Sequence, residues 1–94
     1  MIVYNSNENE LKLDFTHNTR VTSDIVKGAT FCDAFYNGQR VATGVAICGS
    51  DDNFSKKEGR KKSLKRALEH LSKYYGLSKQ EREDIWKIYH ETMS

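Results

Sequence analysis

Apolar and polar side chains alternate over residues 10–16, where apolar residues occupy every second position. Alternation of this kind is typical of a β-strand that buries one face. Two longer apolar segments, residues 29–36 and residues 39–48, flank the pair Asn37 and Gly38. These two residues readily take the positive φ values that a two-residue turn requires, so we expect a β-hairpin here.

The faces of this hairpin depend on how its strands pair. A regular two-residue turn places Phe35 opposite Arg40 and, further from the turn, Phe31 opposite Gly44. One face would then carry Phe31, Phe35, Ala42, Gly44 and Ala46, and the other would carry Cys32, Ala34, Val41, Val45 and Ile47. The small residues of the first face would let a helix approach closely. Because both faces are apolar, we expect the second to be covered by a further element or by another copy of the chain in a homodimer.

Residues 20–26 form a weaker candidate strand because polar residues interrupt its apolar pattern. Turn-forming residues flank this segment at residues 17–19 and at Lys27 and Gly28. We therefore expect the chain to reverse direction at both places.

The apolar period changes from two to about 3.6 after residue 53, which indicates helices. Ser55 and Glu58 match a capping box, and Gly76 is placed to end the helix. The capping pattern recurs at Ser78 and Glu81. The first helix carries an apolar stripe of Leu64, Ala67, Leu68, Leu71 and Tyr75. The second carries Ile85, Ile88, Tyr89 and Thr92 on one face, with Trp86 and Met93 at its edge.

The order of these elements predicts an α+β fold: an antiparallel sheet of three to four strands with two C-terminal helices packed on one face. With 94 residues, the chain has room for a single domain with one modest core. The sheet half is expected in residues 1–48 and the helical half in residues 55–94. A domain of this size is not expected to hold a deep catalytic cleft.

Composition places the chain among folded globular proteins, with 37% hydrophobic and 30% charged residues. No apolar run is long enough to span a membrane and the N-terminus lacks the layout of a signal peptide, so we expect a cytoplasmic protein. Cys32 and Cys48 are expected to be buried thiols, since no secretion signal favours a disulfide. His17, His70 and His90 are scattered, and nothing places a nucleophile beside a base. We therefore expect no metal site, no cofactor and no enzymatic activity.

Basic residues are concentrated in one segment. Residues 55–66 contain Lys56, Lys57, Arg60, Lys61, Lys62, Lys65 and Arg66 against one acid, Glu58, which gives a net charge of +6. The other 82 residues hold 8 basic and 12 acidic residues, which gives a net charge of −4. The basic segment opens the first predicted helix, where free backbone amides and the positive end of the dipole also favour anions. Phosphate groups are the ligands expected there.

Lys57, Arg60 and Lys61 project along the same helical stripe as Leu64 and Leu68, so we expect the first two turns to overhang the sheet. A basic helix face can simply be solvated. Positive charge here opposes the helix dipole, however, and lysines four residues apart repel each other by roughly 0.2–0.5 kcal/mol per pair. Stability alone would favour acidic residues at these positions, so the pattern favours a binding function.

A β-hairpin followed by Ser55, Lys56 and Lys57 at a helix start, and by small and basic residues up to Leu71, resembles the second half of a double-stranded-RNA-binding domain. In that family the lysines straddle backbone phosphates. The resemblance implies phosphate contacts by Lys56, Lys57, Arg60 and Lys61. The chain departs from the family in having strand-like sequence where the family has its first helix, and in adding a second C-terminal helix.

The chain also carries a strand from Gly44 to Cys48 with small residues at alternate positions, then Asp52 and Phe54, and then Gly59 before an Arg-Ala pair in the helix. This order is similar to that of small accessory proteins of tailed bacteriophages. Some small phage proteins inhibit host defence or host nucleic-acid machinery. The resemblance therefore implies a phage-encoded protein in the host cytoplasm.

Two functions remain open on the sequence. The leading hypothesis is a non-enzymatic binder of the nucleic-acid backbone that does not read bases and uses Lys56, Lys57, Arg60, Lys61, Lys62, Lys65 and Arg66. The alternative is an inhibitor, similar to anti-CRISPR proteins, that binds a host nucleic-acid-handling or defence complex and occupies its nucleic-acid or partner surface. Aromatic side chains could stack on bases, but their helical spacing favours packing in the core. These are Tyr74, Tyr75, Trp86 and Tyr89.

Overall fold

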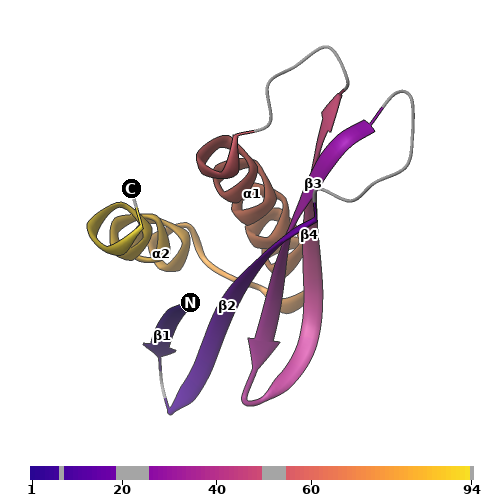
Figure 1. The fold of residues 1–94 in the computed structure, drawn as a ribbon. Helices are drawn as coiled ribbons and strands as arrows, with labels where there is room; N and C mark the ends of the chain where they lie inside the picture. Colours follow the sequence, from indigo (N-terminus) through magenta and orange to yellow (C-terminus); the bar gives the residue numbers. More distant parts are fainter. Residues whose placement is uncertain (7, 19–25, 50–54, 94) are drawn as a thin grey trace.

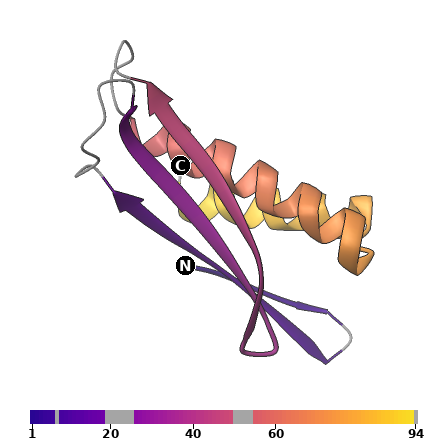
Figure 2. The same cartoon turned by 90° about the vertical axis from the view of Figure 1, so that its right-hand side faces the viewer.

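The described part of the chain forms four strands followed by two helices. The computed structural model describes residues 1–6, 8–18, 26–49 and 55–93, and only the backbone of residues 26 and 27. The elements are β1 (Ile2–Ser6), β2 (Asn9–Asn18), β3 (Val26–Tyr36), β4 (Gln39–Gly49), α1 (Lys56–Tyr75) and α2 (Lys79–Thr92). The strands form an antiparallel sheet in the order β1-β2-β3-β4, and both helices lie on the same side of it (Figures 1 and 2). This arrangement confirms the predicted α+β fold, with four strands.

The sheet includes one strand that the sequence analysis did not identify. In β1, which pairs with β2, Ile2 is buried and faces the same side as Tyr4. The predicted strand at residues 20–26 lies outside the described residues, apart from Val26 at the start of β3. Asp52 and Phe54 of the phage-like motif lie outside them as well.

The reversal predicted at Lys27 and Gly28 is wrong, whereas the chain does reverse after β2, which ends at Asn18 and pairs antiparallel with β3. β2 continues through His17 and Asn18, which pair with Thr30 and Ala29 of β3. Gly28 lies inside β3, where it pairs with Cys48 of β4. A register irregularity beside Gly28 explains the glycine there, because bulges tolerate residues that weaken a regular strand.

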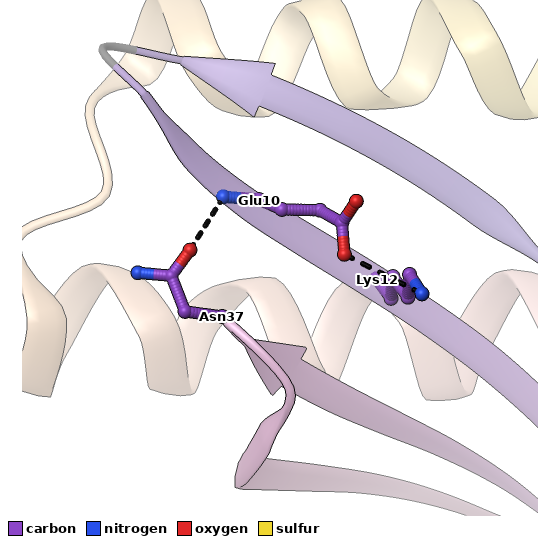
Figure 3. Close-up of polar contacts among 3 residues, drawn as sticks. All are labelled: Glu10, Lys12 and Asn37. Carbon is purple, nitrogen blue, oxygen red and sulfur yellow. Dashed lines mark hydrogen bonds and ion pairs between the residues drawn. The ribbon is translucent and has the colours of Figure 1, made fainter.

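The predicted hairpin turn is confirmed, and Asn37 ties it to the neighbouring strand. Asn37 and Gly38 have φ values of 49° and 85°. The Asn37 side-chain Oδ1 accepts from the Glu10 backbone amide at 2.8 Å (Figure 3), while the Asn37 backbone amide donates to the Glu10 carbonyl at 2.8 Å. Glu10 in turn pairs with Lys12 at 3.4 Å (Figure 3). Hydrogen bonds from both the backbone and the side chain of Asn37 therefore hold the turn against β2.

The predicted pairing of the hairpin is correct only beside the turn. Phe35 lies opposite Arg40 as expected, but a register irregularity follows, and Phe31 pairs with Val45 instead of Gly44. A shift of one residue moves side chains to the opposite face of the sheet. The buried face of the hairpin therefore carries Cys32, Ala34, Ala42, Gly44 and Ala46, and Phe31 and Phe35 lie on the other face.

α1 packs against this small-residue face at very short range. A Cβ atom at Gly44 would stand 1.9 Å from the Ser63 carbonyl oxygen, and one at Gly59 would stand 2.1 Å from Thr30 Oγ1. The predicted overhang of the first two turns is therefore wrong, because Gly59 brings the start of the helix directly onto β3. The predicted stripe is otherwise confirmed by four buried residues, Leu64, Ala67, Leu68 and Leu71, while Tyr75 is 54% exposed.

α2 covers the β1 side of the sheet and completes the core with Ile85 and Tyr89. The Tyr4 hydroxyl of β1 donates to Asp84 Oδ2 at 3.1 Å, and the guanidinium of Arg82 reaches back to the Ser72 hydroxyl of α1. These contacts hold α2 to both β1 and α1. Thr92, predicted on the buried stripe, is exposed at the end of the helix.

Neither helix covers the second face of the sheet. Ile47 is 62% exposed on this face, and Phe31 and Phe35 are half-buried. Asp14 and Asp33 interrupt the apolar surface as a pair across β2 and β3. Within the described residues no element lies over this face, so its cover by a second copy stays a prediction. Neither described helix is long and apolar enough to cross a membrane.

Candidate functional site

The basic segment begins at a well-formed helix start. The Ser55 hydroxyl accepts from the Glu58 amide at 3.3 Å, and the Gly59 amide donates to the Ser55 carbonyl at 2.9 Å. This bonding confirms Ser55 as the N-cap, and Glu58 is the acidic residue of the first turn. The seven basic side chains therefore project from a fixed helical frame with its positive dipole end at residue 56.

Six of the seven predicted site residues are exposed and one is half-buried. The half-buried residue is Arg60. Among the described residues, the only ion pair joins Lys12 to Glu10 on β2, so the described carboxylates form no ion pair with the basic segment. The exposed residues are Lys56, Lys57, Lys61, Lys62, Lys65 and Arg66.

Arg60 lies where α1 crosses the ends of β2 and β3. Its Nε atom is buried and has no hydrogen-bond partner in the described part of the chain. His17 lies nearby on β2, with its Nδ1 atom 2.9 Å from the Thr30 hydroxyl. Burial lowers the pKa of His17, and the positive charges of Arg60 and Lys56 lower it further. The pKa of His17 thus responds to the positive potential of the helix start.

Arg66 differs from the other members of the segment because it is already engaged. Its guanidinium Nη1 donates to the Val45 carbonyl of β4, the strand at the edge of the sheet. This contact fixes the side chain along the strand while leaving it exposed. Arg66 therefore helps to hold α1 on the sheet, and only its remaining donors can reach a ligand.

The lysines in the middle of the segment line two neighbouring hollows on the surface of α1. Lys62 and Lys65 contribute to both. A depression of about 280 Å³ is lined by Lys62, Lys65, Arg66 and Glu69. A groove of about 360 Å³ between α1 and α2, which we call the helix groove, is lined by Lys61, Lys62, Lys65, Trp86 and His90.

The helix groove brings together residues that the charge pattern did not connect. Trp86 and His90 come from α2, and their rings are inclined by 27° with centroids 6.0 Å apart. Trp86 also meets the buried Tyr89 edge to face at 5.6 Å and 86°. The sequence placed Trp86 at the edge of the α2 stripe, and that edge position is the signal that it could contact both the core and a surface groove.

Among the described residues, no three His, Cys, Asp or Glu side chains lie close enough together to hold a metal ion. A further cavity of about 210 Å³ lies at the other end of α1, lined by residues that include Tyr4, Tyr75 and Glu81. It contains none of the predicted basic residues. The chemistry that the described surface offers most clearly is therefore the binding of anions along α1.

Comparison with known proteins found no matching family model, and no significant match among curated proteins or solved structures.

Proposed function

We propose that this protein binds the sugar-phosphate backbone of nucleic acids, without catalysis, through the basic first half of α1. The observation that carries this proposal is a concentration of exposed cations that form no ion pair with the described carboxylates. Phosphates spaced along a nucleic-acid strand supply charge of the opposite sign. Their binding releases condensed counterions, and that release provides most of the affinity of backbone binders.

The packing of α1 supports a rigid binding surface. Gly44 and Gly59 let the helix backbone lie against the sheet, and the Arg66 contact with Val45 adds a polar link. A helix held this closely presents its lysines at fixed intervals. Ordering the surface before binding reduces the entropy lost when a ligand is bound.

The chemistry of the side chains favours phosphate contacts over recognition of base edges. Five of the seven basic residues are lysines, which act as compact point charges without the bidentate fork that reads guanine. Of the two arginines, Arg66 is bonded to β4 and Arg60 is half-buried. Binding is therefore expected to vary little with base sequence.

Fluorescence anisotropy with labelled oligonucleotides tests this function. The test variant combines Lys57→Glu, Lys61→Glu and Lys62→Glu, and the matched control combines Lys73→Glu, Lys79→Glu and Lys87→Glu. All six lysines are exposed on the two helices, and both variants change the net charge equally. We expect at least about a tenfold greater loss of affinity in the test variant, because it removes direct phosphate contacts.

The test variant is not expected to unfold, since acidic residues near a helix start are favourable to the dipole. Thermal denaturation of both variants checks this point. Equal losses of affinity in the two variants would contradict the proposal, because they would show that net charge alone attracts the oligonucleotide. Absence of oligonucleotide binding by the wild-type protein would contradict it more directly.

The uncovered second face of the sheet favours a second candidate function, an inhibitor that binds a host nucleic-acid-handling or defence complex. On this face Ile47 is 62% exposed and the paired Phe31 and Val45 are half-buried, and exposed apolar patches commonly mark protein contacts. The discriminating experiment is recovery of binding partners from host lysate with and without nuclease treatment. Recovery of one protein complex that survives nuclease treatment would favour the inhibitor, whereas loss of all partners would favour the nucleic-acid binder.

A further inference from the structure

The helix groove combines aromatic rings with basic side chains. Figure 2 shows α2 running back behind α1, and one groove is lined by residues from the C-terminal half of α2 and the basic half of α1. The groove is lined by Trp86 and His90 of α2 and by Lys61, Lys62 and Lys65 of α1. Aromatic faces and cations within one hollow are the arrangement with which proteins hold single-stranded nucleic acids.

Contacts with the hydrophobic core hold the Trp86 ring in place. It is half-buried, it packs against the core, and its edge-to-face contact with Tyr89 joins it to a side chain that is only 1% exposed. His90 lies beside it at a small inclination of 27°. The indole therefore keeps one orientation before any ligand arrives, which lowers the entropy lost when a flat ligand stacks on it.

The charge of the lining decides what kind of ligand fits. The groove is lined by three lysines and by no acidic residue in the described part of the chain. The exposed lining of the groove is mainly apolar, and the three lysines are exposed to solvent, so a ring can lie in the groove while an anionic group beside it pairs with the ammonium groups. A nucleotide has both parts, since it carries a flat base and a phosphate a few bonds apart.

The volume of the groove is also compatible with a small flat ligand. At about 360 Å³, it lies near the lower end of the roughly 300–1,000 Å³ typical of small-ligand sites. A base that remains paired in a duplex cannot present its face to the indole, because both of its faces are covered by neighbouring bases. Away from the ends of a duplex, only an unpaired or extruded base can stack on Trp86.

We propose that the helix groove takes an unpaired base of single-stranded nucleic acid, which stacks on Trp86 while Lys61, Lys62 and Lys65 hold the flanking phosphates. This inference rests on the proposed function and adds the substrate class to it: single strands are preferred over duplexes. Because stacking does not depend on the identity of the base, it remains compatible with weak sequence preference.

Trp86 is the single tryptophan of the chain, so fluorescence excited at a wavelength that tyrosine does not absorb reports on this site alone. The protein is titrated with a single-stranded oligothymidylate, with an abasic oligonucleotide of the same length and charge, and with a duplex. We expect the oligothymidylate to quench Trp86 and to bind about tenfold more tightly than the abasic strand, in line with the stacking of one base. The abasic strand is expected to bind without quenching.

The three strands separate this inference from the function on which it rests. Equal affinity for the oligothymidylate and the abasic strand, with no quenching, would overturn base stacking and leave backbone binding intact. Tighter binding of the duplex than of the single strand would also overturn it. If none of the three strands binds, both the inference and the proposed function fail.

Variants of Trp86 provide a second measurement by anisotropy. Trp86→Leu removes the flat ring, and we expect the roughly tenfold preference for base over abasic strands to disappear, with the affinity for the abasic strand unchanged. Trp86→Phe keeps a ring in the core and is expected to retain part of the preference. Retention of the full preference in a folded Trp86→Leu protein would overturn the proposal. If Trp86→Leu fails to fold, the quenching titration and the Trp86→Phe variant test the proposal instead. The proposal is overturned if Trp86→Phe keeps the full preference for base-containing over abasic strands and the oligothymidylate does not quench the wild-type protein.

Discussion

Gly44 of β4 lies directly against Ser63 of α1, so that a Cβ atom at position 44 would stand 1.9 Å from the Ser63 carbonyl oxygen and 2.6 Å from the Ala67 amide nitrogen. Both of these atoms belong to the helix backbone, which cannot move aside as a side-chain end can. The contact therefore sets the distance between α1 and the sheet. It also fixes the direction in which the lysines between positions 56 and 65 project.

The first prediction follows from this contact. Gly44→Ala forces α1 away from β4. We expect the free energy of unfolding to fall by about 1–3 kcal/mol, which is the typical cost of overpacking a core. Thr43→Ala is the matched control: Thr43 is exposed on the opposite face, and its hydrogen bond to Asp33 is expected to contribute about 1 kcal/mol or less. Urea denaturation of both variants checks the difference. A Gly44→Ala protein as stable as the wild type would show that the helix does not pack this closely.

The second prediction concerns the turn at Asn37. Asn37→Gly keeps a residue that accepts the φ of 49° but removes the side-chain bonds to Glu10 and Asn9, whereas Asn37→Ala removes the bonds and adds strain. We expect Asn37→Ala to be less stable than Asn37→Gly by about 1 kcal/mol. Thermal or urea denaturation of the two variants measures the difference. Equal stability would indicate that the backbone at position 37 is not held in the left-handed region.

The third prediction concerns Cys32, which is fully buried on the helix-facing side of the sheet. Burial, together with the charges of Asp33 and Asp14, raises the pKa of the Cys32 thiol from 9.0 to about 12. The folded state therefore favours the neutral thiol. Its contribution to stability is complete below pH 9.0 and is lost as the pH rises through the interval to about 12.

Alkaline denaturation of three proteins tests this prediction: the wild type, Cys32→Ala and Cys48→Ala. Other groups also titrate in this range, so the relevant quantity is the difference in pH dependence between proteins. We expect Cys32→Ala to lose less stability above pH 9.0 than the wild type, and Cys48→Ala serves as the comparison for removal of a thiol elsewhere on the sheet. An identical alkaline slope in all three would contradict the assignment of a buried neutral thiol to Cys32.

The fourth prediction uses His17 as a reporter of the charge at the helix start. Its pKa is lowered from 6.5, first by burial and then by Arg60 and Lys56. Replacing Lys56 by Gln removes one of these charges, so we expect the pKa of His17 to rise while burial keeps it below 6.5. NMR titration of the imidazole measures the change, and Lys73→Gln at the far end of α1 serves as the control.

The same shift makes one contribution to the acid dependence of stability. Because the folded pKa of His17 lies below the unfolded value of 6.5, the unfolded state takes up the proton first. The stability associated with neutral His17 is complete above 6.5 and is lost as the pH falls through the folded pKa. An unchanged His17 pKa in Lys56→Gln would show that the charge of Lys56 does not affect the imidazole of His17 on β2.

The local chemistry of single residues predicted much of the fold. The hairpin turn at Asn37, the caps at Ser55 and Ser78 and the helix end at Gly76 all depend on interactions within a few residues, and each occurs where expected. The sequence did not predict β1, because five residues are too few to establish an alternating pattern. Its place in the sheet depends instead on pairing with β2.

The errors have a common physical origin in contacts that the linear pattern does not encode. The irregularity after Ala34 exchanged the faces of Phe31 and Cys32, because a shift of one residue reverses every side chain beyond it. Gly59 gave the same local signal as any helical glycine, and only its position above Thr30 shows why a larger residue is excluded there.

The candidate site likewise has features that the sequence predicts and features that depend on tertiary contacts. All seven basic residues could be selected from their density in the sequence, and the structure places six of them at the surface. The engagement of Arg66 with Val45 and the meeting of Lys61 with Trp86 depend on how α1 crosses the sheet and α2. No spacing within one helix predicts those crossings.

The dependence of oligonucleotide affinity on salt tests the central claim most directly. If lysines of α1 contact phosphates, the logarithm of the association constant falls linearly with the logarithm of salt concentration. Replacing a phosphate-contacting lysine by an uncharged residue makes this slope shallower by about 0.7–0.9. The comparison is between the wild type, Lys61→Gln with Lys65→Gln, and the control pair Lys73→Gln with Lys79→Gln. The account predicts a shallower slope for the first pair and a wild-type slope for the control. An affinity independent of salt, or the same slope in all three proteins, would contradict it.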